Sequence, residues 1–184
     1  MYTTREEWLG SAVEEVRALF GINGFPLPEK IRVTCGFASK GGRGKVVGEH
    51  WAPSASEDAT HEISVSPTIA EPIEVLGILM HELCHSATLG DGHKGRFPSA
   101  IRSVWLEGKP TTTTVGQKFK DNFAALLEEL GDYPHAVLNA RQHVPQGTRL
   151  LKAVCTDCEY TIRLTRKWAT LGLPTCVCGG DFQI

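Results

Sequence analysis

The segment His81-Glu82-Leu83-Cys84-His85 constrains this chain more than any other, because its two histidines are four residues apart. On an α-helix this spacing places both imidazoles on one face, about one turn apart, where they can bind one metal ion. The flanking sequence favours such a helix, since Pro72 suits its first turn and Gly90 its end. Apolar residues recur at helical spacing on the face away from the histidines: Ile73, Leu76, Met80 and Leu83. We therefore predict a helix with one packed side and one side facing a cleft.

Glu82 supplies a carboxylate beside the two histidines. A zinc ion with three protein ligands keeps one position for water and lowers the pKa of that water to about 7, so that a nearby carboxylate can accept its proton as it attacks a carbonyl. The pattern predicts peptide hydrolysis with zinc as cofactor and Glu82 as general base. The alternative is a surface helix with two solvated histidines, but the strand pattern before the helix and a histidine after it favour the metal site.

A third ligand must come from outside the helix, and His93 is our first choice. It follows Asp91 and Gly92 just past the predicted helix end, where glycines let the chain turn back toward the metal. Glutamates from later segments are the alternatives: Glu107, Glu128 and Glu129. The remaining histidines are expected to be structural or at the surface, with one of them available as an oxyanion donor: His50, His61, His135 and His143.

Other patterns predict a mixed set of helices and strands. Thr4 and Glu7 have the spacing of a capping box for a helix that ends at Gly21. Strand patterns cover 31–37, 46–51 and 62–66, so a sheet of at least three strands is expected. Amphipathic helices are predicted over 97–108 and 115–131, with 110–114, one proline and four threonines, as a connector.

Four of the six cysteines fall in the last thirty residues as two close pairs: Cys155 and Cys158, then Cys176 and Cys178. Four thiolates on two turns are typical of a zinc ribbon, whose closed coordination sphere makes the ion structural. The intervening 160–168 has a strand pattern, and Pro145 with Gly147 marks the boundary before this tail. Unpaired structural cysteines are the alternative. The other two cysteines, Cys35 and Cys84, are expected to be small buried apolar residues.

Charge limits the partners of the chain. The formal net charge is -2, so nucleic acid is not attracted to the molecule as a whole. The tail nevertheless carries a basic set with Tyr160 and Trp168 among it, which suits DNA contacts: Arg149, Lys152, Arg163, Arg166 and Lys167. A solvated charged face is the alternative. The loop 40–45 is a second candidate anion site, but it lacks the spacing of a nucleotide-binding loop.

Composition predicts a cytoplasmic protein without a membrane partner. The chain is 41% hydrophobic and 22% charged, and no segment approaches the roughly 20 apolar residues of a membrane span. Acidic residues stand where a signal peptide would carry basic or apolar ones. Free thiolates for zinc also require a reducing compartment.

Several of these segments together resemble the SprT-like (Spartan) metallopeptidase family: Ile63-Ser64-Val65-Ser66-Pro67, His81 to His85, Asp91-Gly92-His93 and Phe97. The tail resembles the zinc ribbon of that family, and the compact pair is similar to small proteins of bacteriophage genomes, which would place it in the host cytoplasm. The resemblance implies His81, His85 and His93 as zinc ligands, Glu82 as the catalytic residue, and protein substrates crosslinked to DNA. The loop from His85 to His93 is short for the family, so the metal site carries over better than the substrate.

The sequence thus predicts an α+β protein: a zincin-like, SprT-like domain over 1–146, with a small mixed sheet and the His-Glu helix, and a zinc ribbon over 147–184. The predicted activity is that of a zinc metalloendopeptidase with one catalytic and one structural zinc ion. The alternative function is a nucleic-acid-binding or transcription-associated zinc protein without proteolytic activity, in which the histidine helix is only structural.

Overall fold

The computed structural model describes residues 2–39, 45–139 and 150–184, which form two compact units, one up to residue 139 and one from residue 150. The predicted boundary between 146 and 147 lies outside the described residues, as do His143, Arg149 and most of the loop 40–45. Both units mix helices and small sheets, so the prediction of an α+β fold is confirmed. No helix in these three ranges combines the length and the apolar character needed to cross a membrane.

The first unit contains a three-stranded mixed sheet, as predicted. Its strands are β1 (Ile31–Cys35), β2 (Gly48–Trp51) and β3 (His61–Val65), in the order β1-β3-β2. β1 runs parallel to β3 and β2 runs antiparallel to it. Alternate residues of β3 are buried, which marks the face that packs on the core. On the other face, Arg32 forms ion pairs with Asp58 and Glu62.

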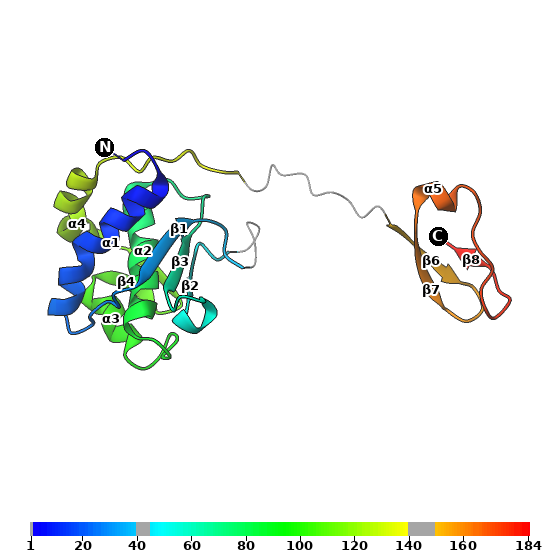
Figure 1. Ribbon diagram of the computed structural model, residues 1–184, viewed down its shortest axis with the longest axis horizontal. Coiled ribbons are helices and arrows are strands. Elements are labelled where there is room, and N and C mark those ends of the chain that lie inside the picture. Colours follow the sequence, from blue (N-terminus) through cyan, green and yellow to red (C-terminus); the bar gives the residue numbers. More distant parts are fainter. Residues whose placement is uncertain (1, 40–44, 140–149) are drawn as a thin grey trace. The chain divides into compact units, whose positions relative to one another are not determined.

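Helices cover the buried face of this sheet (Figure 1). The helices on the sheet are α1 (Arg5–Ile22) and α2 (Pro72–Ala87). The short α3 (Phe97–Ser103) and α4 (Gln117–Leu130) pack against α2, and a 3-10 turn η1 spans Pro53–Ala55. The largest core side chains come from the helices and β3 and are fully buried: Trp8, Phe20, Ile63, Leu76, Leu79, Phe97 and Phe119. α2 contributes to this core along most of its length, so its position is fixed by packing.

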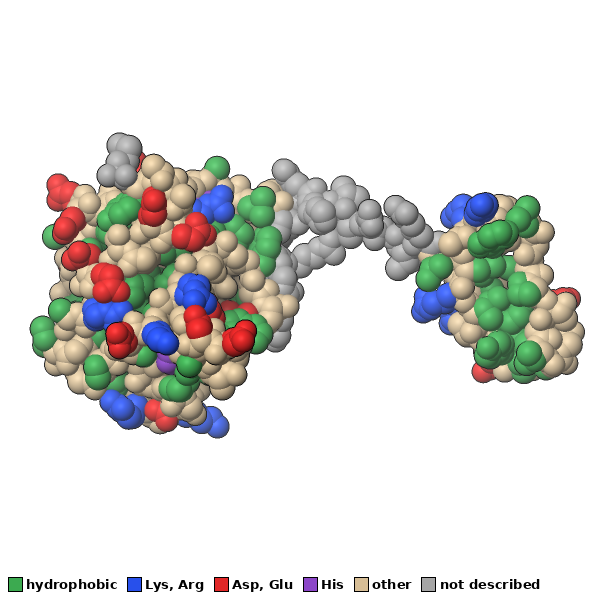
Figure 2. Space-filling view, viewed as in Figure 1, with side chains coloured by type: hydrophobic (Ala, Val, Ile, Leu, Met, Phe, Trp, Pro, Cys, Tyr) green, Lys and Arg blue, Asp and Glu red, His purple; other side chains and the backbone are tan. Residues whose placement is uncertain are grey.

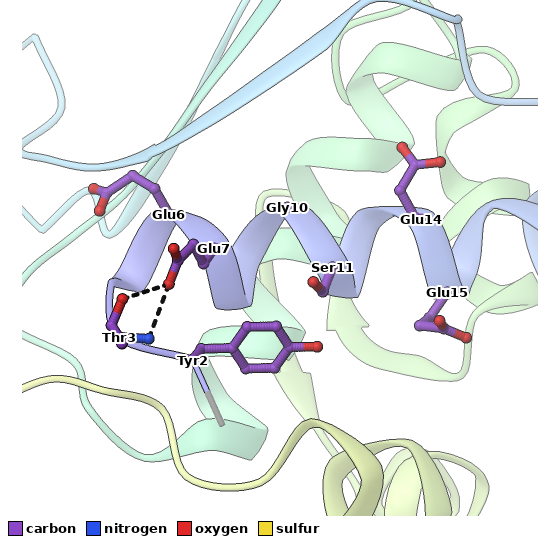
Figure 3. A pocket seen from close by; sticks show the side chains of 8 residues that line it. All are labelled: Tyr2, Thr3, Glu6, Glu7, Gly10, Ser11, Glu14 and Glu15. Atoms are coloured by element: carbon purple, nitrogen blue, oxygen red, sulfur yellow. Dashed lines mark hydrogen bonds between the residues drawn. The ribbon is translucent and has the colours of Figure 1, made fainter.

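The capping box predicted at the start of α1 is present. Thr4 Oγ1 accepts a hydrogen bond from the backbone N–H of Glu7, and the Glu7 carboxylate accepts one from the Thr4 backbone. The Glu7 carboxylate also accepts bonds from the backbone N–H and the hydroxyl of Thr3 (Figure 3). These donors, the Thr3 backbone first, lower the pKa of Glu7. An open groove of about 690 Å³ runs along this acidic side of α1, and none of the predicted metal ligands lines it.

The region after α3 differs from the prediction. α3 ends at Ser103, and Trp105 has a positive φ of 59° that stops the helix, although its ring still packs on Phe123 of α4. The expected connector 110–114 belongs instead to a hairpin of β4 (Leu106–Lys109) and β5 (Thr112–Val115). The β-branched threonines suit this strand, and the last predicted helix accordingly begins at Gln117 rather than at 115.

The second unit is a small three-stranded sheet in the order β7-β6-β8. Its elements are β6 (Leu150–Cys155), β7 (Thr161–Thr165), the single-turn helix α5 (Arg166–Ala169) and β8 (Phe182–Gln183). The strand predicted over 160–168 is therefore shorter, because the chain turns into α5 after Thr165. The buried core consists of Ala153, Cys155, Cys176 and Phe182. So small a core rarely stabilises a fold without a metal or disulfides.

Truncation of Leu76 should test how strongly the packing of α2 supports the first unit. Leu76 is 0% exposed, so Leu76→Ala leaves a cavity and should lower the free energy of unfolding by about 2–5 kcal/mol. The measurement is denaturant unfolding followed by helix circular dichroism, which reports the first unit. Leu89→Ala is the matched control, since Leu89 is 53% exposed and should change stability by less than about 0.5 kcal/mol. Equal effects of the two substitutions would contradict the assigned core.

Candidate metal centre

A cleft of about 620 Å³ in the first unit contains the His-Glu segment. α2 forms its floor, strand β2 lies on one side, and the hairpin strand β5 lies on the other. The residues of α2 that line the cleft recur at helical spacing: Glu74, Gly77, Ile78, His81, Glu82 and His85. The face of α2 opposite them holds Leu76, Met80 and Leu83, all fully buried. The predicted division of this helix into a packed side and a cleft side is therefore confirmed.

Two glycines allow the strands to approach α2 this closely. A Cβ atom at Gly48 of β2 would lie 2.6 Å from Glu82 Oε1 and 2.7 Å from Ile78 Cγ2. A Cβ atom at Gly77 of α2 would collide with Val115 Cγ1 on β5. Neither position has room for a side chain, so glycine is required on each side of the cleft.

Three imidazoles converge at the end of this cleft. His81, His85 and His93 each offer a ligand atom, and these atoms all lie within 4.8 Å of one another. A tetrahedral ion with bonds of about 2.0–2.1 Å needs nitrogens about 3.3 Å apart, a separation that small side-chain rotations supply. The residues therefore fit a metal ion. Phe97 supports all three, with its ring centroid 4.2 Å from that of His85 and 5.2 Å from those of His81 and His93.

The loop after α2 brings His93 back toward the helix. Thr88 ends α2 through a bond of 2.7 Å from its Oγ1 to the carbonyl of Cys84. Gly90 and Gly92 then adopt positive φ angles, 91° and 56°, which reverse the chain as predicted. The Asp91 carboxylate accepts a hydrogen bond of 2.9 Å from the Arg96 backbone and closes the loop. The turn is thus held by its own hydrogen bonds.

His81 is oriented by a residue of β5. His81 Nδ1 and Thr113 Oγ1 are 2.9 Å apart and form a hydrogen bond. When Nδ1 donates this bond, Nε2 is the nitrogen with a lone pair for a metal. Burial lowers the pKa of His81 to about 4 and that of His85 to about 3, in both cases with smaller contributions from neighbouring histidines. Both rings are therefore neutral at neutral pH, the form that binds metals.

Glu82 is buried at the base of the cleft, with only 6% of its surface exposed. Burial, and then the nearby carboxylate of Glu49, raise the pKa of Glu82 to about 8. A divalent cation held by the three imidazoles would act in the opposite direction, because it favours the carboxylate. The group can therefore carry or release a proton near neutral pH, as a general base must.

The other candidates for the third ligand lie outside this cluster. Glu107 is on β4 with its carboxylate packed against Gly116, and Glu128 and Glu129 are exposed on α4. His135 Nε2–H donates a hydrogen bond of 2.7 Å to the Pro67 carbonyl, which is a structural role. Cys84 is fully buried, as predicted, and Cys35 is half-buried.

The four predicted ribbon cysteines form the second cluster. Cys155 and Cys178 Sγ are 3.5 Å apart, as are Cys158 and Cys176 Sγ, and all four are free thiols within 4.8 Å of one another. Backbone N–H groups of Asp157 and then Cys158 lower the pKa of Cys155 to about 7. The cluster can therefore bind a metal ion through thiolates on two tight turns.

Sequence reasoning missed Thr113, the supporting role of Phe97, and the position of His50. Thr113 was assigned to a connector, and no local signal pairs it with a histidine 32 positions earlier. Phe97 was named as part of a helix and of the family resemblance, but not as a residue that contacts the histidines. His50 was one of four histidines expected to be structural or at the surface, with one of the four left open as an oxyanion donor. It lines the cleft, and its ring lies 6.2 Å from that of His85.

No protein-family model, curated protein or solved structure matches this chain. A function for the chain must therefore be inferred from the geometry of its histidine and cysteine clusters.

Removal of the Thr113 hydroxyl should weaken metal binding by the histidine cluster. Thr113→Val keeps the shape of the side chain but leaves His81 Nδ1 without its partner, so affinity for zinc should fall by about 10- to 100-fold. Competition titration with a chromophoric chelator measures this constant. Thr114→Val is the matched control, because Thr114 is the exposed neighbour on the same strand. Unchanged affinity in Thr113→Val would contradict the orienting role.

Proposed function

We propose that the first unit is a zinc-dependent metallopeptidase. The observation that carries this proposal is the convergence of His81, His85 and His93 at a cleft that also contains a buried carboxylate, Glu82. We further propose that the chain is a zincin of the SprT-like kind, with a second zinc ion bound by the four cysteines as a structural centre.

Each group in the proposed site has its own role in hydrolysis. A zinc ion held by His81, His85 and His93 would lower the pKa of the attacking water to about 7 and polarise the carbonyl of the substrate. Glu82 accepts the proton of the attacking water and delivers it to the leaving amine. Gly48 leaves room for the Glu82 carboxylate beside β2. The cleft, at about 620 Å³, has the volume for several residues of a peptide.

The second unit supports a role for DNA as the partner that brings protein substrates to the site. Lys152 of β6 and Arg163 of β7 lie directly opposite each other in the sheet register. Like charges so placed repel, and a phosphate between them relieves the repulsion. Lys167 Nζ lies 5.1 Å from the ring centroid of Trp168, which is 57% exposed. Figure 2 shows the basic side chains of this unit separated from its acidic ones.

A nucleic-acid-binding protein without proteolytic activity is the second candidate function. The exposed Trp168 and Tyr160 favour it, since bases stack on such rings without regard to sequence. In that function the histidine centre would be only structural. The two candidate functions differ in the role of Glu82. It is the general base of the peptidase, whereas a carboxylate beside a purely structural metal has no proton to accept.

Replacement of Glu82 by glutamine should abolish peptide cleavage without loss of metal. Glu82→Gln keeps the size of the side chain but cannot accept a proton, so kcat/KM should fall by at least about 100-fold. The measurement is fragment analysis by mass spectrometry with a DNA-bound protein as substrate, beside zinc analysis that should give two ions per chain. Glu74→Gln is the matched control, because Glu74 lines the same cleft from the same helix. Equal cleavage by Glu82→Gln and the parent would refute this role of Glu82, and no cleavage by any form would favour the second candidate.

Single-stranded DNA should bind the second unit through Trp168 and the basic pair. Trp168→Ala should reduce affinity by about 5- to 150-fold, the value of one stacked base. Lys152→Ala should lower the salt dependence of log Kd by about 0.7, as loss of one phosphate contact does. Fluorescence anisotropy at several salt concentrations measures both. Val177→Ala is the control, since Val177 is 94% exposed and lies outside the basic set. Identical anisotropy curves for Trp168→Ala and the control would contradict this surface.

A further inference from the structure

A pair of histidines beside the metal centre is not used by the ligand set. His50 Nε2 and His61 Nδ1 are 2.9 Å apart, with His50 on β2 and His61 at the start of β3. His61 is buried at 6% exposure, and His50 lines the cleft. A hydrogen bond between two imidazoles shielded from water fixes the ring plane of the more accessible one, which is His50.

The strand register directs His50 toward the reacting groups. Residues two apart on a strand share a face, and Gly48 on the same face lies against the Glu82 carboxylate. The ring of His50 lies nearly parallel to that of His85, at 9° and 6.2 Å between centroids. Phe97, whose ring stacks on His85 at 4.2 Å, does not line the cleft, whereas His50 does. It borders the cleft without belonging to the cluster of ligand atoms.

The chemistry of the pair determines what His50 can offer. A hydrogen bond between two neutral imidazoles uses one N–H and one lone pair, so His50 carries one N–H and keeps one ring nitrogen for a ligand. If His61 donates to His50 Nε2, that N–H is on Nδ1, the atom left for a ligand in the cleft. Glu49, Glu74 and Glu82 line the same cleft. Their carboxylates favour a proton on His50 Nδ1, because a lone pair on that atom would face negative charge.

We propose that His50, positioned by His61, donates a hydrogen bond from Nδ1 to the carbonyl oxygen of the peptide bond under attack as negative charge develops on it. This inference rests on the proposed peptidase function and assigns to one residue the role of oxyanion donor. Removal of one such donor in other hydrolases lowers kcat by about 10²–10³-fold.

Steady-state kinetics of His50 variants test the assignment. His50→Phe should lower kcat by about 10²–10³-fold with little change in KM, and His50→Asn, which keeps a side-chain N–H, should recover part of the loss. Leu89→Ala is the control, since Leu89 is exposed and does not line the cleft. Parent-like kcat in His50→Phe would overturn this inference alone. No cleavage by the parent would overturn the peptidase function and this inference with it.

Two further measurements separate a hydrogen-bond donor from a fourth ligand or a structural residue. Absorption spectra of the cobalt(II)-substituted parent and His50→Phe should be the same, whereas a changed spectrum would make His50 a ligand. Long-range ¹⁵N–¹H correlation spectra of the zinc-loaded parent, assigned with His50→Phe, should show His50 with its proton on Nδ1. A proton on Nε2 would overturn the proposal, because Nδ1 would then be an acceptor.

Discussion

The tight packing of α2 between the core and the two strands of the cleft is the constraint on which the site depends. Leu76, Met80 and Leu83 are fully buried on one side, so the helix cannot rotate about its axis without exposing apolar surface. The strip that remains open is the one with His81 and His85. Metal ligands on a helix fixed in this way are already arranged before any ion binds, which reduces the cost of ordering them.

Close backbone approach gives the cleft its shape. Gly48 and Gly77 bring β2 and β5 against α2, and each strand places a further polar group near the histidines. From β5 comes Thr113, which bonds His81, and from β2 comes His50, which lies beside His85. The two strands therefore supply the surroundings of the metal centre, while α2 and its following loop supply the ligands. Such surroundings set the affinity and reactivity of a metal as much as the ligands do.

The second unit has a much smaller apolar core than the first unit. Its buried core contains only four residues, two of which are cysteines of the cluster. So little apolar burial rarely stabilises a fold by itself, and a metal ion bound by the four cysteines would couple binding to folding. Trp168 of α5 is exposed, and in the neighbouring sheet two cations, Lys152 and Arg163, lie opposite each other.

The sequence by itself determined the features that are encoded locally. The spacing of His81 and His85, the glycines before His93, the capping box at Thr4 and the two cysteine pairs were all readable, because each lies within one or two turns of chain. The end of the helix predicted over 97–108 and the connector 110–114 were predicted wrongly, since Trp105 stops α3 and the threonines pair in a hairpin. Only the tertiary structure decided that Thr113 faces His81 and that His50 meets His61, because the packing of distant segments leaves no periodic signal in the sequence.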